Sequence, residues 1–393
     1  MSHYPYLIIG GGMTAHAAVS SIRSIDNEKA IGVLCQEPYP PYLRPPLTKG
    51  LWKGRPVDRI WCRTESKKAD VILGEKAVSL DIAQKRVLTD KGRTFSFEKL
   101  LIATGGRPRT LPFTDQEIIY YRDLADYYKL KEIVASAESF GVIGGGFIGT
   151  EITSCLSALG KKVSMIFLEE GIGRRIFPSE LSLRLNNYFE QKGINLFPNQ
   201  SVVGYRKEKN KQIILTSAGK ELAFDCVIAG LGIIPNVELA KEAGIKTENG
   251  IIVNEQLQTN IEDIYAAGDV ANFYNPQLGL WMRVEHEDNA RKMGDYAGKA
   301  MAGHPQVYNH IPSFYSDFFS FSYESVGLAD GNLAVISFWN TDQSKGVLYY
   351  HNGSKLLGIL LWNLVGKLPE ARQLLNEAPS PDPHLLASKL SIS

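Results

Sequence analysis

Two glycine-rich stretches stand far apart in the chain, and each follows a run of apolar residues. They read Gly10-x-Gly12-x-x-Ala15 and Gly144-x-Gly146-x-x-Gly149. Glycines at this spacing, between a strand and a helix, let the backbone approach a pyrophosphate because no side chain stands in its path. The helix that follows supplies free N–H groups and the positive end of its dipole. The spacing therefore predicts two dinucleotide-binding turns in one chain.

An acidic residue follows each turn at the end of the next expected strand. These residues are Glu37 and Glu169, and a carboxylate in this place can accept hydrogen bonds from an adenosine ribose. Each acid lies further from its turn than the usual spacing of about 20 residues, but its location at a strand end fits. Because a carboxylate repels a 2′-phosphate, Glu169 favours NADH over NADPH, while the nearby Arg174 and Arg175 act against that preference.

Each turn sits inside a strand–turn–helix–strand pattern. The expected elements are Tyr6–Ile9, Met13–Ile25 and Ala30–Cys35 in the first copy, and Phe140–Ile143, Thr150–Leu159 and Val163–Leu168 in the second. Their apolar strands are typical of a parallel sheet covered on both faces. A further strand that runs into glycine follows each copy, at Leu100–Gly106 and at Val227–Gly232. The duplication therefore covers whole domains.

Length, charge and hydrophobicity bear on the number of domains, on the kind of partner and on the location of the protein. The chain has 393 residues, which suggests two or three domains, and a formal net charge of +1. This balance gives no overall attraction to nucleic acid or to an anionic membrane. The first expected strand begins close to the N-terminus, and no apolar run reaches the ~18 residues of a membrane span. We therefore expect a soluble, cytoplasmic protein with no signal peptide, no membrane or nucleic-acid partner and no metal site.

Four cysteines are scattered along the chain, at Cys35, Cys62, Cys155 and Cys226. No two of them form a closely spaced pair, so the sequence predicts partly buried thiols and no disulfide framework. The same scatter argues against a dithiol relay.

Two dinucleotide sites in one chain imply two coenzymes, one that donates electrons and one that accepts them. NAD(P)H and FAD form the natural pair, because a nicotinamide passes hydride directly to a flavin. The two turns would then face each other, so that the reactive rings meet between the domains. The proline-rich loop Tyr39–Trp52 would bring Arg44 and Lys49 near the first coenzyme, although a rigid surface loop with solvated cations is the alternative.

The predicted fold class is α/β, with two Rossmann-like dinucleotide-binding domains and a C-terminal α+β domain. Thr259–Val270 has the pattern of a return to the first sheet, so the NAD domain is expected to be inserted in the FAD domain. We expect the FAD-binding domain at 1–118 and 241–305, the NAD(P)H-binding domain at 119–240 and the C-terminal domain at 306–393. In the last of these, HNGS predicts a hairpin turn and Pro369 opens a helix.

Several longer segments resemble one family over almost the whole chain. They are PYLRPPLTK, LLIATGGRPR, VIGGGFIGTE, GLGIIPNVELA, IYAAGDVANFY, RVEHEDNARKMGDYAGKAMAG, SFYSD, YESVGL and GILLWN. Together they resemble the FAD-dependent pyridine nucleotide oxidoreductases, and most closely the apoptosis-inducing-factor-like flavoproteins. Ferredoxin, rubredoxin and putidaredoxin reductases of bacteria are near relatives of that group. RVEHEDNA and GILLWN favour the apoptosis-inducing-factor branch.

The resemblance implies contacts for each coenzyme. For FAD it implies a pyrophosphate cradle at Gly10, Gly12, Met13, Thr14 and Ala15, adenosine contacts at Glu37, Arg44 and Val78, and further contacts at Arg122, Asp269, Glu285, His286 and Tyr315. For the nicotinamide coenzyme it implies Gly146, Phe147, Ile148, Gly149, Glu169, Arg175, Gly232, Glu324 and Asn363.

Four residues would lie closest to the chemistry. Lys49 and Glu151 resemble the family's buried ion pair beside the flavin, whereas the residues alone would favour a solvated acid in the first turn of a helix. Phe147 would lie between the flavin and the nicotinamide pocket, and His286 would approach the flavin. The alternatives for these two residues are a core aromatic at the helix entry and a surface histidine.

The resemblance implies an FAD-dependent NAD(P)H oxidoreductase that passes hydride from NADH to FAD and electrons on to an acceptor. The first hypothesis is an apoptosis-inducing-factor-like protein that oxidises NADH slowly and changes its dimerisation. The alternative is a reductase for a small iron–sulfur electron carrier, of the ferredoxin or rubredoxin type. The acceptor stays open among a small redox protein, a quinone and oxygen, as does a homodimer. Disulfide and peroxide reductases are not expected, because no cysteine lies in the first helix or near PYLRPP.

Overall fold

The protein is described by a computed structural model that covers residues 2–113, 117–377 and 380–392. Its chain divides into two compact units, each built from three separate segments. Unit 1 comprises Met1–Arg44, Pro56–Arg107 and Ile234–Phe314, and unit 2 comprises Pro45–Arg55, Pro108–Ile233 and Tyr315–Ser393. Two of the segment boundaries, after Arg107 and after Ile233, fall within short strands. These strands, β7 (Gly106–Pro108) and β16 (Ile233–Pro235), pair as a two-stranded sheet. Each unit is described by itself below.

The main sheet of unit 1 has the strand order β3-β2-β1-β6-β5-β4, with β19 also paired to β6. Its strands are β1 (Ser2–Ile9), β2 (Ile31–Leu34), β3 (Asp70–Ile72), β4 (Ala77–Asp81), β5 (Arg86–Thr89), β6 (Thr94–Ile102) and β19 (Ile264–Ala266). β1 runs parallel to β2 and β6, and Leu7 and Ile8 near its C-terminal end are fully buried. The first glycine turn therefore leaves the sheet between two parallel neighbours.

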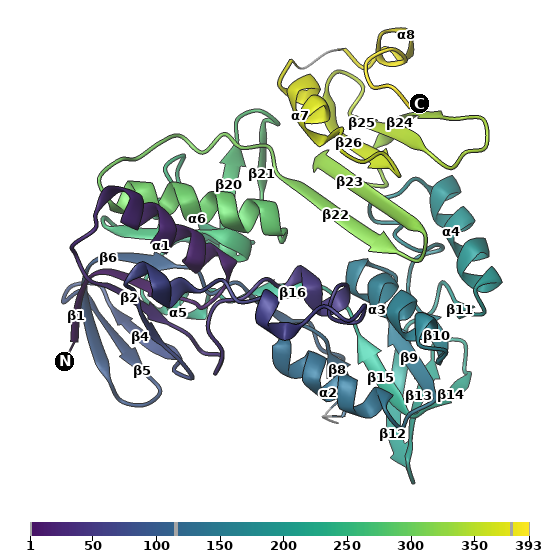
Figure 1. The fold of residues 1–393 in the computed structure, drawn as a ribbon, viewed down its shortest axis with the longest axis horizontal. Coiled ribbons are helices and arrows are strands. Elements are labelled where there is room, and N and C mark those ends of the chain that lie inside the picture. The colour runs from purple at the N-terminus through teal and green to yellow at the C-terminus, as the bar shows by residue number, and fades with distance from the viewer. Residues whose placement is uncertain (1, 114–116, 378–379, 393) are drawn as a thin grey trace. The chain divides into compact units, whose positions relative to one another are not determined.

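Two helices of unit 1 pack closely, as Figure 1 shows for α1 (Met13–Ile25) and α6 (Glu287–Met301). A Cβ added at Gly294 would lie 2.3 Å from the carbonyl oxygen of Thr14, and one at Gly298 would lie 2.5 Å from that of Ala18. Only glycine permits such an approach. The unit also contains α5 (Glu238–Glu242) and a sheet of β17 (Thr247–Glu248), β18 (Gly250–Ile252), β20 (Ala271–Asn275) and β21 (Leu280–Met282).

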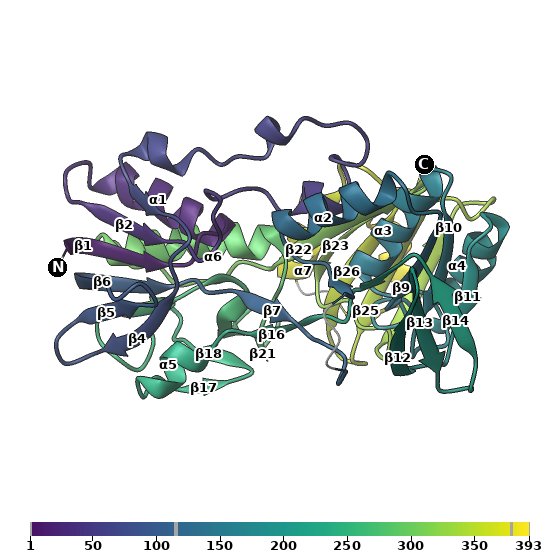
Figure 2. The same ribbon diagram turned by 90° about the horizontal axis from the view of Figure 1, so that it is seen from below.

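Unit 2 contains a second parallel sheet, with the order β11-β10-β9-β15-β8. Its strands are β8 (Ile119–Tyr120), β9 (Ser139–Ile143), β10 (Lys162–Ile166), β11 (Asn195–Phe197) and β15 (Cys226–Ala229), and its helices are α2 (Leu124–Val134), α3 (Phe147–Ala158) and α4 (Ser179–Gln191). Figure 2 shows α3 alongside β9 and β10. An antiparallel sheet follows, of β12 (Val202–Glu208), β13 (Lys211–Thr216) and β14 (Glu221–Phe224).

A five-stranded antiparallel sheet ends the chain, with the order β22-β23-β26-β25-β24. Its strands are β22 (Ser313–Phe318), β23 (Phe321–Gly327), β24 (Ala334–Trp339), β25 (Gly346–His351) and β26 (Leu356–Trp362), and α7 (Leu368–Glu377) and α8 (Pro383–Leu386) follow. β26 is buried over its whole length. Its central position between β23 and β25 accounts for the continuous apolar run in the sequence.

The predicted fold class is confirmed, including the return of the chain to the first sheet at β19. The hairpin at HNGS joins β25 to β26 as predicted. The second helix was predicted to start at Thr150, but α3 starts at Phe147, directly after the glycine turn. β10 also ends at Ile166, two residues before the predicted end. The predicted division at 118, 240 and 305 concerns coenzyme-binding domains and stays a prediction.

Candidate functional site

The first glycine turn, between β1 and α1, has the geometry of an anion cradle. Gly10 adopts a φ of +123°, and a Cβ there would lie 2.1 Å from the carbonyl oxygen of Ala103, so glycine is required. Gly12 is the N-cap of α1, and the place of its missing Cβ faces open space among the described residues. Neither a capping side chain nor an acid occupies the first turn of α1. The free N–H groups of Met13, Thr14 and Ala15 would suit a pyrophosphate.

Glu37 lies just beyond β2 and is held by two side chains of the same loop. Tyr42 donates its hydroxyl to Oε2 at 2.6 Å, and Arg44 donates to Oε1 at 2.5 Å. The guanidinium of Arg44 also lies over the Tyr42 ring, 5.2 Å from its centroid. The strand that carries Val78 starts beside this acid, because the N–H of Gly74 donates to the Glu37 carbonyl at 3.0 Å. Val78 itself lies on β4 and is exposed.

A second cluster of unit 1 gathers Asp269, Glu285 and His286. Asp269 lies in the short 3₁₀ helix Gly268–Val270, and Arg283 donates to its carbonyl oxygen at 3.2 Å while pairing with the Glu285 carboxylate at 2.8 Å. His286 is the N-cap of α6, and its ring stacks on Phe314 with centroids 4.4 Å apart.

Burial lowers the pKa of His286 to about 4, although the carboxylates of Asp269 and Asp288 act in the opposite direction. The imidazole is therefore neutral at neutral pH. The His286 side chain is half-buried, with Phe314 stacked on its ring. The 3₁₀ helix Gly268–Val270, which carries Asp269, packs against the first turn of α1. A Cβ at Gly268 would lie 2.3 Å from the hydroxyl oxygen of Thr14.

In unit 2, the second glycine turn repeats the geometry of the first. Gly144 adopts a φ of +109°, and a Cβ there would lie 2.4 Å from the carbonyl oxygen of Gly230. Gly146 is the N-cap of α3, and the place of its missing Cβ again faces open space among the described residues. At Gly149 a Cβ would lie only 1.9 Å from the Gly144 oxygen. Gly232, on a nearby loop with a φ of +81°, also faces open space within the described chain.

Lys49 and Glu151 form a buried ion pair within unit 2. Lys49 follows the 3₁₀ helix Pro45–Thr48, and its Nζ lies 2.5 Å from Oε1 of Glu151. Only 13% of the lysine side chain and 3% of the glutamate side chain are exposed. The solvated alternative for Glu151 is therefore wrong. Burial without a partner would cost several kcal/mol, which the pairing offsets.

Two hydroxyl groups that the sequence reasoning missed complete the shell around Glu151. Thr48 donates to Oε2 at 2.5 Å, and Ser316 donates to Oε1 at 2.5 Å. Both residues lie in segments that carried the family resemblance, PYLRPPLTK and SFYSD, but neither had an assigned role. Tyr315, the neighbour of Ser316, places its half-exposed ring over Lys49, 5.3 Å from the ammonium.

Phe147 begins α3 and stacks with Tyr323 at a centroid distance of 6.4 Å. Burial raises the pKa of Tyr323 well above its usual value, so that its hydroxyl stays protonated. The neighbouring Glu324 on β23 has one buried oxygen, Oε2, without a hydrogen-bond partner among the described residues. Burial raises the pKa of Glu324. An unpartnered acceptor of this kind is suited to a ligand donor.

Asn363 is already engaged by its own sheet. Its Oδ1 accepts from the N–H of Ser322 at 2.7 Å, and its Nδ2 donates to the carbonyl oxygen of Ser344 at 2.9 Å. The residue also adopts a positive φ of 50°. This geometry joins the ends of neighbouring strands. Arg122, which was predicted to contact FAD, lies in unit 2 directly before α2, where its N–H donates to Asp126.

Glu169 lies beyond β10, and its Oε1 accepts from Nε of Arg175 at 2.7 Å. The arginine side chain is 76% exposed and that of the acid 24%. Arg174 pairs instead with Glu170 at 3.0 Å. The two arginines that weighed against NADH in the sequence therefore each neutralise a carboxylate in the structure.

The four cysteines are free thiols. Burial raises the pKa of Cys62 to about 11 and those of Cys35, Cys155 and Cys226 to about 12. Because the thiolate is the nucleophile in disulfide exchange, these thiols are poorly suited to a redox relay. No group of three or more metal-ligating side chains occurs in the part of the chain that the structure describes.

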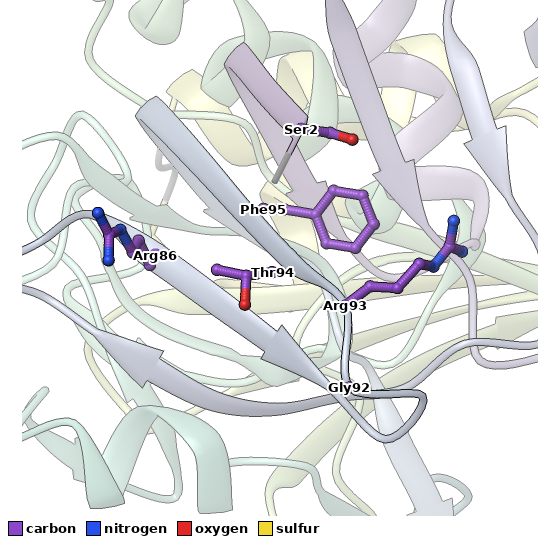
Figure 3. A pocket seen from close by; sticks show the side chains of 6 residues that line it. All are labelled: Ser2, Arg86, Gly92, Arg93, Thr94 and Phe95. Carbon is purple, nitrogen blue, oxygen red and sulfur yellow. The ribbon is translucent and has the colours of Figure 1, made fainter.

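A separate hollow on unit 1 involves none of the predicted site residues (Figure 3). It is lined by Ser2, Arg86, Gly92, Arg93, Thr94 and Phe95. The guanidinium of Arg93 is engaged by the fully buried carboxylate of Glu75. Of the two arginines that line the hollow, Arg93 is therefore already paired, whereas Arg86 is exposed. Across the described ranges, no helix is both long and apolar enough to cross a bilayer.

Comparisons with known proteins agree with this arrangement. The sequence model of a family described as pyridine nucleotide-disulphide oxidoreductase matches residues 4–294. The mitochondrial apoptosis-inducing factor 1 of Dictyostelium discoideum is 33% identical over 95% of this chain and 79% of its own length. A ferredoxin reductase from Rhodopseudomonas palustris has a similar structure, with a TM-score of 0.91 and 28% identity over 98% of this chain and 97% of that one. Putidaredoxin reductase in its covalent complex with putidaredoxin matches with a TM-score of 0.91 and 25% identity, over 98% and 96% of the two chains.

Proposed function

The chain belongs to the pyridine nucleotide-disulphide oxidoreductase family, and on that premise we propose that it oxidises NADH with bound FAD and passes electrons to a second redox partner. It is an FAD-dependent NAD(P)H oxidoreductase, similar to apoptosis-inducing factors and ferredoxin reductases. One observation carries the finer proposal: two glycine turns with the same geometry leave open space beside Gly12 and beside Gly146. Two such spaces suit two pyrophosphates.

FAD would bind at the first turn and the nicotinamide coenzyme at the second. The order is supported by the partners of the two acids: two partly buried side chains hold Glu37, whereas a single, mostly exposed arginine holds Glu169. A coenzyme that stays bound suits the first setting, and one that exchanges in every turnover suits the second. The FAD-binding domain would then comprise 1–118 and 241–305, the NAD(P)H-binding domain 119–240, and the C-terminal domain 306–393.

The chemistry itself comes from the coenzymes, since a nicotinamide supplies hydride and a flavin accepts it. The protein residues would bind and orient the two rings and exclude water. Glu151 would hold the ammonium of Lys49 in place, and Thr48 and Ser316 would orient the carboxylate through two hydrogen bonds. The neutral imidazole of His286 would add no charge beside the flavin.

NADH is the proposed donor in preference to NADPH. The support is Glu169, whose carboxylate would accept ribose hydroxyls and repel a 2′-phosphate. Arg175 is engaged by that same carboxylate rather than turned toward a phosphate. Steady-state turnover with NADPH at a kcat/KM equal to or above that with NADH would contradict this choice.

Two identities of the acceptor follow from different relatives. Similarity to the apoptosis-inducing factor of Dictyostelium favours a slow NADH oxidase whose reduced state persists and whose assembly responds to it. The likeness to a structure titled a putidaredoxin reductase–putidaredoxin complex favours a small redox protein as the acceptor. A quinone or oxygen are the other candidates. A homodimer and a cytoplasmic location belong to the proposal as well, and the four free thiols fit a reducing compartment.

Anaerobic titration of the purified protein with NADH tests the core of the proposal. We expect a yellow protein whose visible absorbance bleaches at about one equivalent of NADH per flavin, since one hydride reduces one flavin. A protein that stays colourless after reconstitution with FAD, or that never bleaches with excess NADH, would contradict it. Stopped-flow reoxidation then separates the acceptors. A long-wavelength band that persists in air supports the slow oxidase, and fast reoxidation by a small iron–sulfur protein supports the reductase.

A further inference from the structure

The loop Gly171–Phe177, here called the arginine loop, links the second glycine turn to the C-terminal sheet within unit 2. At one end, the N–H of Gly173 donates to the carbonyl oxygen of Gly145 at 2.9 Å. At the other end, the hydroxyl of Tyr350 on β25 donates to the carbonyl oxygen of Ile176 at 2.8 Å. The loop therefore has fixed partners on both the coenzyme side and the C-terminal side.

Gly331, in the connection between β23 and β24, forms two hydrogen bonds with the middle of the arginine loop. Its N–H donates to the carbonyl oxygen of Arg175 at 2.9 Å, and its own carbonyl oxygen accepts from Nη1 of Arg174 at 2.7 Å. A Cβ at Gly331 would lie 2.1 Å from the carbonyl oxygen of Arg174 and 2.5 Å from that of Phe177. Glycine is therefore the residue that fits between these carbonyl groups.

The backbone carbonyl that Gly331 binds belongs to Arg175. The side chain of the same residue pairs with Glu169, with Nε 2.7 Å from Oε1. An ion pair with a side chain as exposed as this arginine is normally worth little, because ordering a long side chain offsets the attraction. Fixing the Arg175 backbone removes part of that ordering cost. One oxygen of Glu169 then stays occupied by the arginine, and Oε2 is left for a ligand.

We propose that Gly331 and Arg174 are positioning residues for coenzyme selectivity. By fixing the Arg175 backbone, they hold Glu169 in the orientation that accepts ribose hydroxyls, and they keep the Arg175 guanidinium away from a 2′-phosphate. The inference rests on the proposed binding of the nicotinamide coenzyme at the second glycine turn. It makes the C-terminal sheet, which brings Gly331 to the loop, a determinant of the choice between NADH and NADPH.

Calorimetric binding of two coenzyme fragments to the flavin-loaded protein tests the inference without turnover. The fragments are ADP-ribose and its 2′-phosphate. Gly331→Ala inserts a methyl group against the loop, and Arg174→Lys removes the guanidinium donor without adding a Cβ clash. For both variants we expect ADP-ribose affinity to fall about fivefold, which corresponds to one lost hydrogen bond, and the ratio of the two affinities to shrink. Asn332→Ala, at an exposed neighbour, is the matched control and should leave both affinities unchanged.

A double-mutant cycle separates positioning from general loosening of the fold. If Gly331 acts through Arg175, then Gly331→Ala should change the affinity ratio in the wild-type background and leave it unchanged in an Arg175→Ala background. An unchanged ratio in both Gly331→Ala and Arg174→Lys would overturn the inference and leave the proposed function intact, as would an effect that persists without Arg175. A wild-type protein that binds neither fragment would refute the proposed function itself, and the inference with it.

Discussion

The two glycine turns of this chain are copies in their backbone and diverge one helical turn later. Gly12 and Gly146 cap their helices with φ values of −98° and −87°, and each leaves its Cβ place open among the described residues. Five residues further on, unit 1 has Ala17 and unit 2 has Glu151. Ala17 packs against Gly294 of α6, whereas Glu151 accepts three charged or hydroxyl donors. The shared turn thus serves binding, and the helix behind it is free to acquire different chemistry.

The acids that follow the two turns also differ, in the side chains that hold them. Glu37 accepts hydrogen bonds from Tyr42 and Arg44. The side chains of Arg44 and Glu37 are 24% and 28% exposed. Glu169 is held by one arginine that is mostly exposed. Glu37 therefore has two partners in its own loop, whereas the partner of Glu169 depends on a loop that another part of unit 2 supports. Four predictions test these differences between the two units, beginning with the largest expected effect and ending with the smallest.

The largest effect is expected where the two helices diverge. Glu151→Leu leaves the buried ammonium of Lys49 without its carboxylate, and Lys49→Met removes the charge that balances Glu151. Each should lower the free energy of unfolding by roughly 3 kcal/mol, measured by urea denaturation. The double variant removes both charges and should recover most of that loss. A double variant as unstable as the worse single variant would contradict the pairing.

The next effect concerns which coenzyme each turn binds. Gly12→Ala and Gly146→Ala each add a methyl group that clashes with nothing in the described protein but would stand in the path of a pyrophosphate. Gly12→Ala should reduce the flavin content of the purified protein, and Gly146→Ala should raise the KM for NADH about tenfold or more, equivalent to about 1.4 kcal/mol. Flavin loss in Gly146→Ala with none in Gly12→Ala would reverse the assignment of the two turns.

The third prediction concerns the loss of folding stability as the pH falls, which we expect to arise in part from His286 in unit 1. Its pKa is about 4 in the folded protein and near 6.5 in an unfolded chain, so the unfolded state takes up the proton first as the pH falls. The stabilising effect of the neutral ring is complete above about pH 6.5 and is lost progressively down to about pH 4. At pH 5 the loss would be at most about 2 kcal/mol. Compared with wild type, His286→Gln should unfold with a shallower pH dependence between 7 and 5, whereas the exposed His304→Gln should not.

The smallest effect is expected at the exposed ion pair. Arg175→Ala should change the free energy of unfolding by no more than about 0.5 kcal/mol, since such pairs contribute little to stability. Arg44→Ala removes a better-enclosed partner of Glu37 and should cost more, about 1 kcal/mol. Thermal unfolding of both variants under one buffer compares them directly. Equal losses would show that the two arginine partners contribute alike, despite their different exposure.

The fold could be predicted from the sequence because its signals are local. Apolar runs that end in glycine marked β1 and β9, and the turn at HNGS marked the hairpin of β25 and β26. The start of α3 was predicted three residues late, because Phe147, Ile148 and Gly149 do not look like strong helix formers in isolation. The N-cap geometry of Gly146 overrides that preference.

The candidate site was only partly predictable from the sequence. Lys49 and Glu151 were named through family resemblance, whereas their residue types alone favoured exposed charges. Ser316 and Gly331 carried no local signal at all, because their roles depend on partners more than 150 residues away in the chain.

The sequence by itself determined the two glycine turns, the strand–turn–helix–strand order around each of them, and the absence of closely spaced cysteines. These properties depend on backbone geometry and on spacing between near neighbours. Tertiary structure alone decided that Glu151 is buried against Lys49, that burial lowers the pKa of His286, and that Arg175 pairs with Glu169. Charge state and side-chain orientation depend on solvent exclusion and on donors brought together from distant segments, and a linear pattern does not encode those distances.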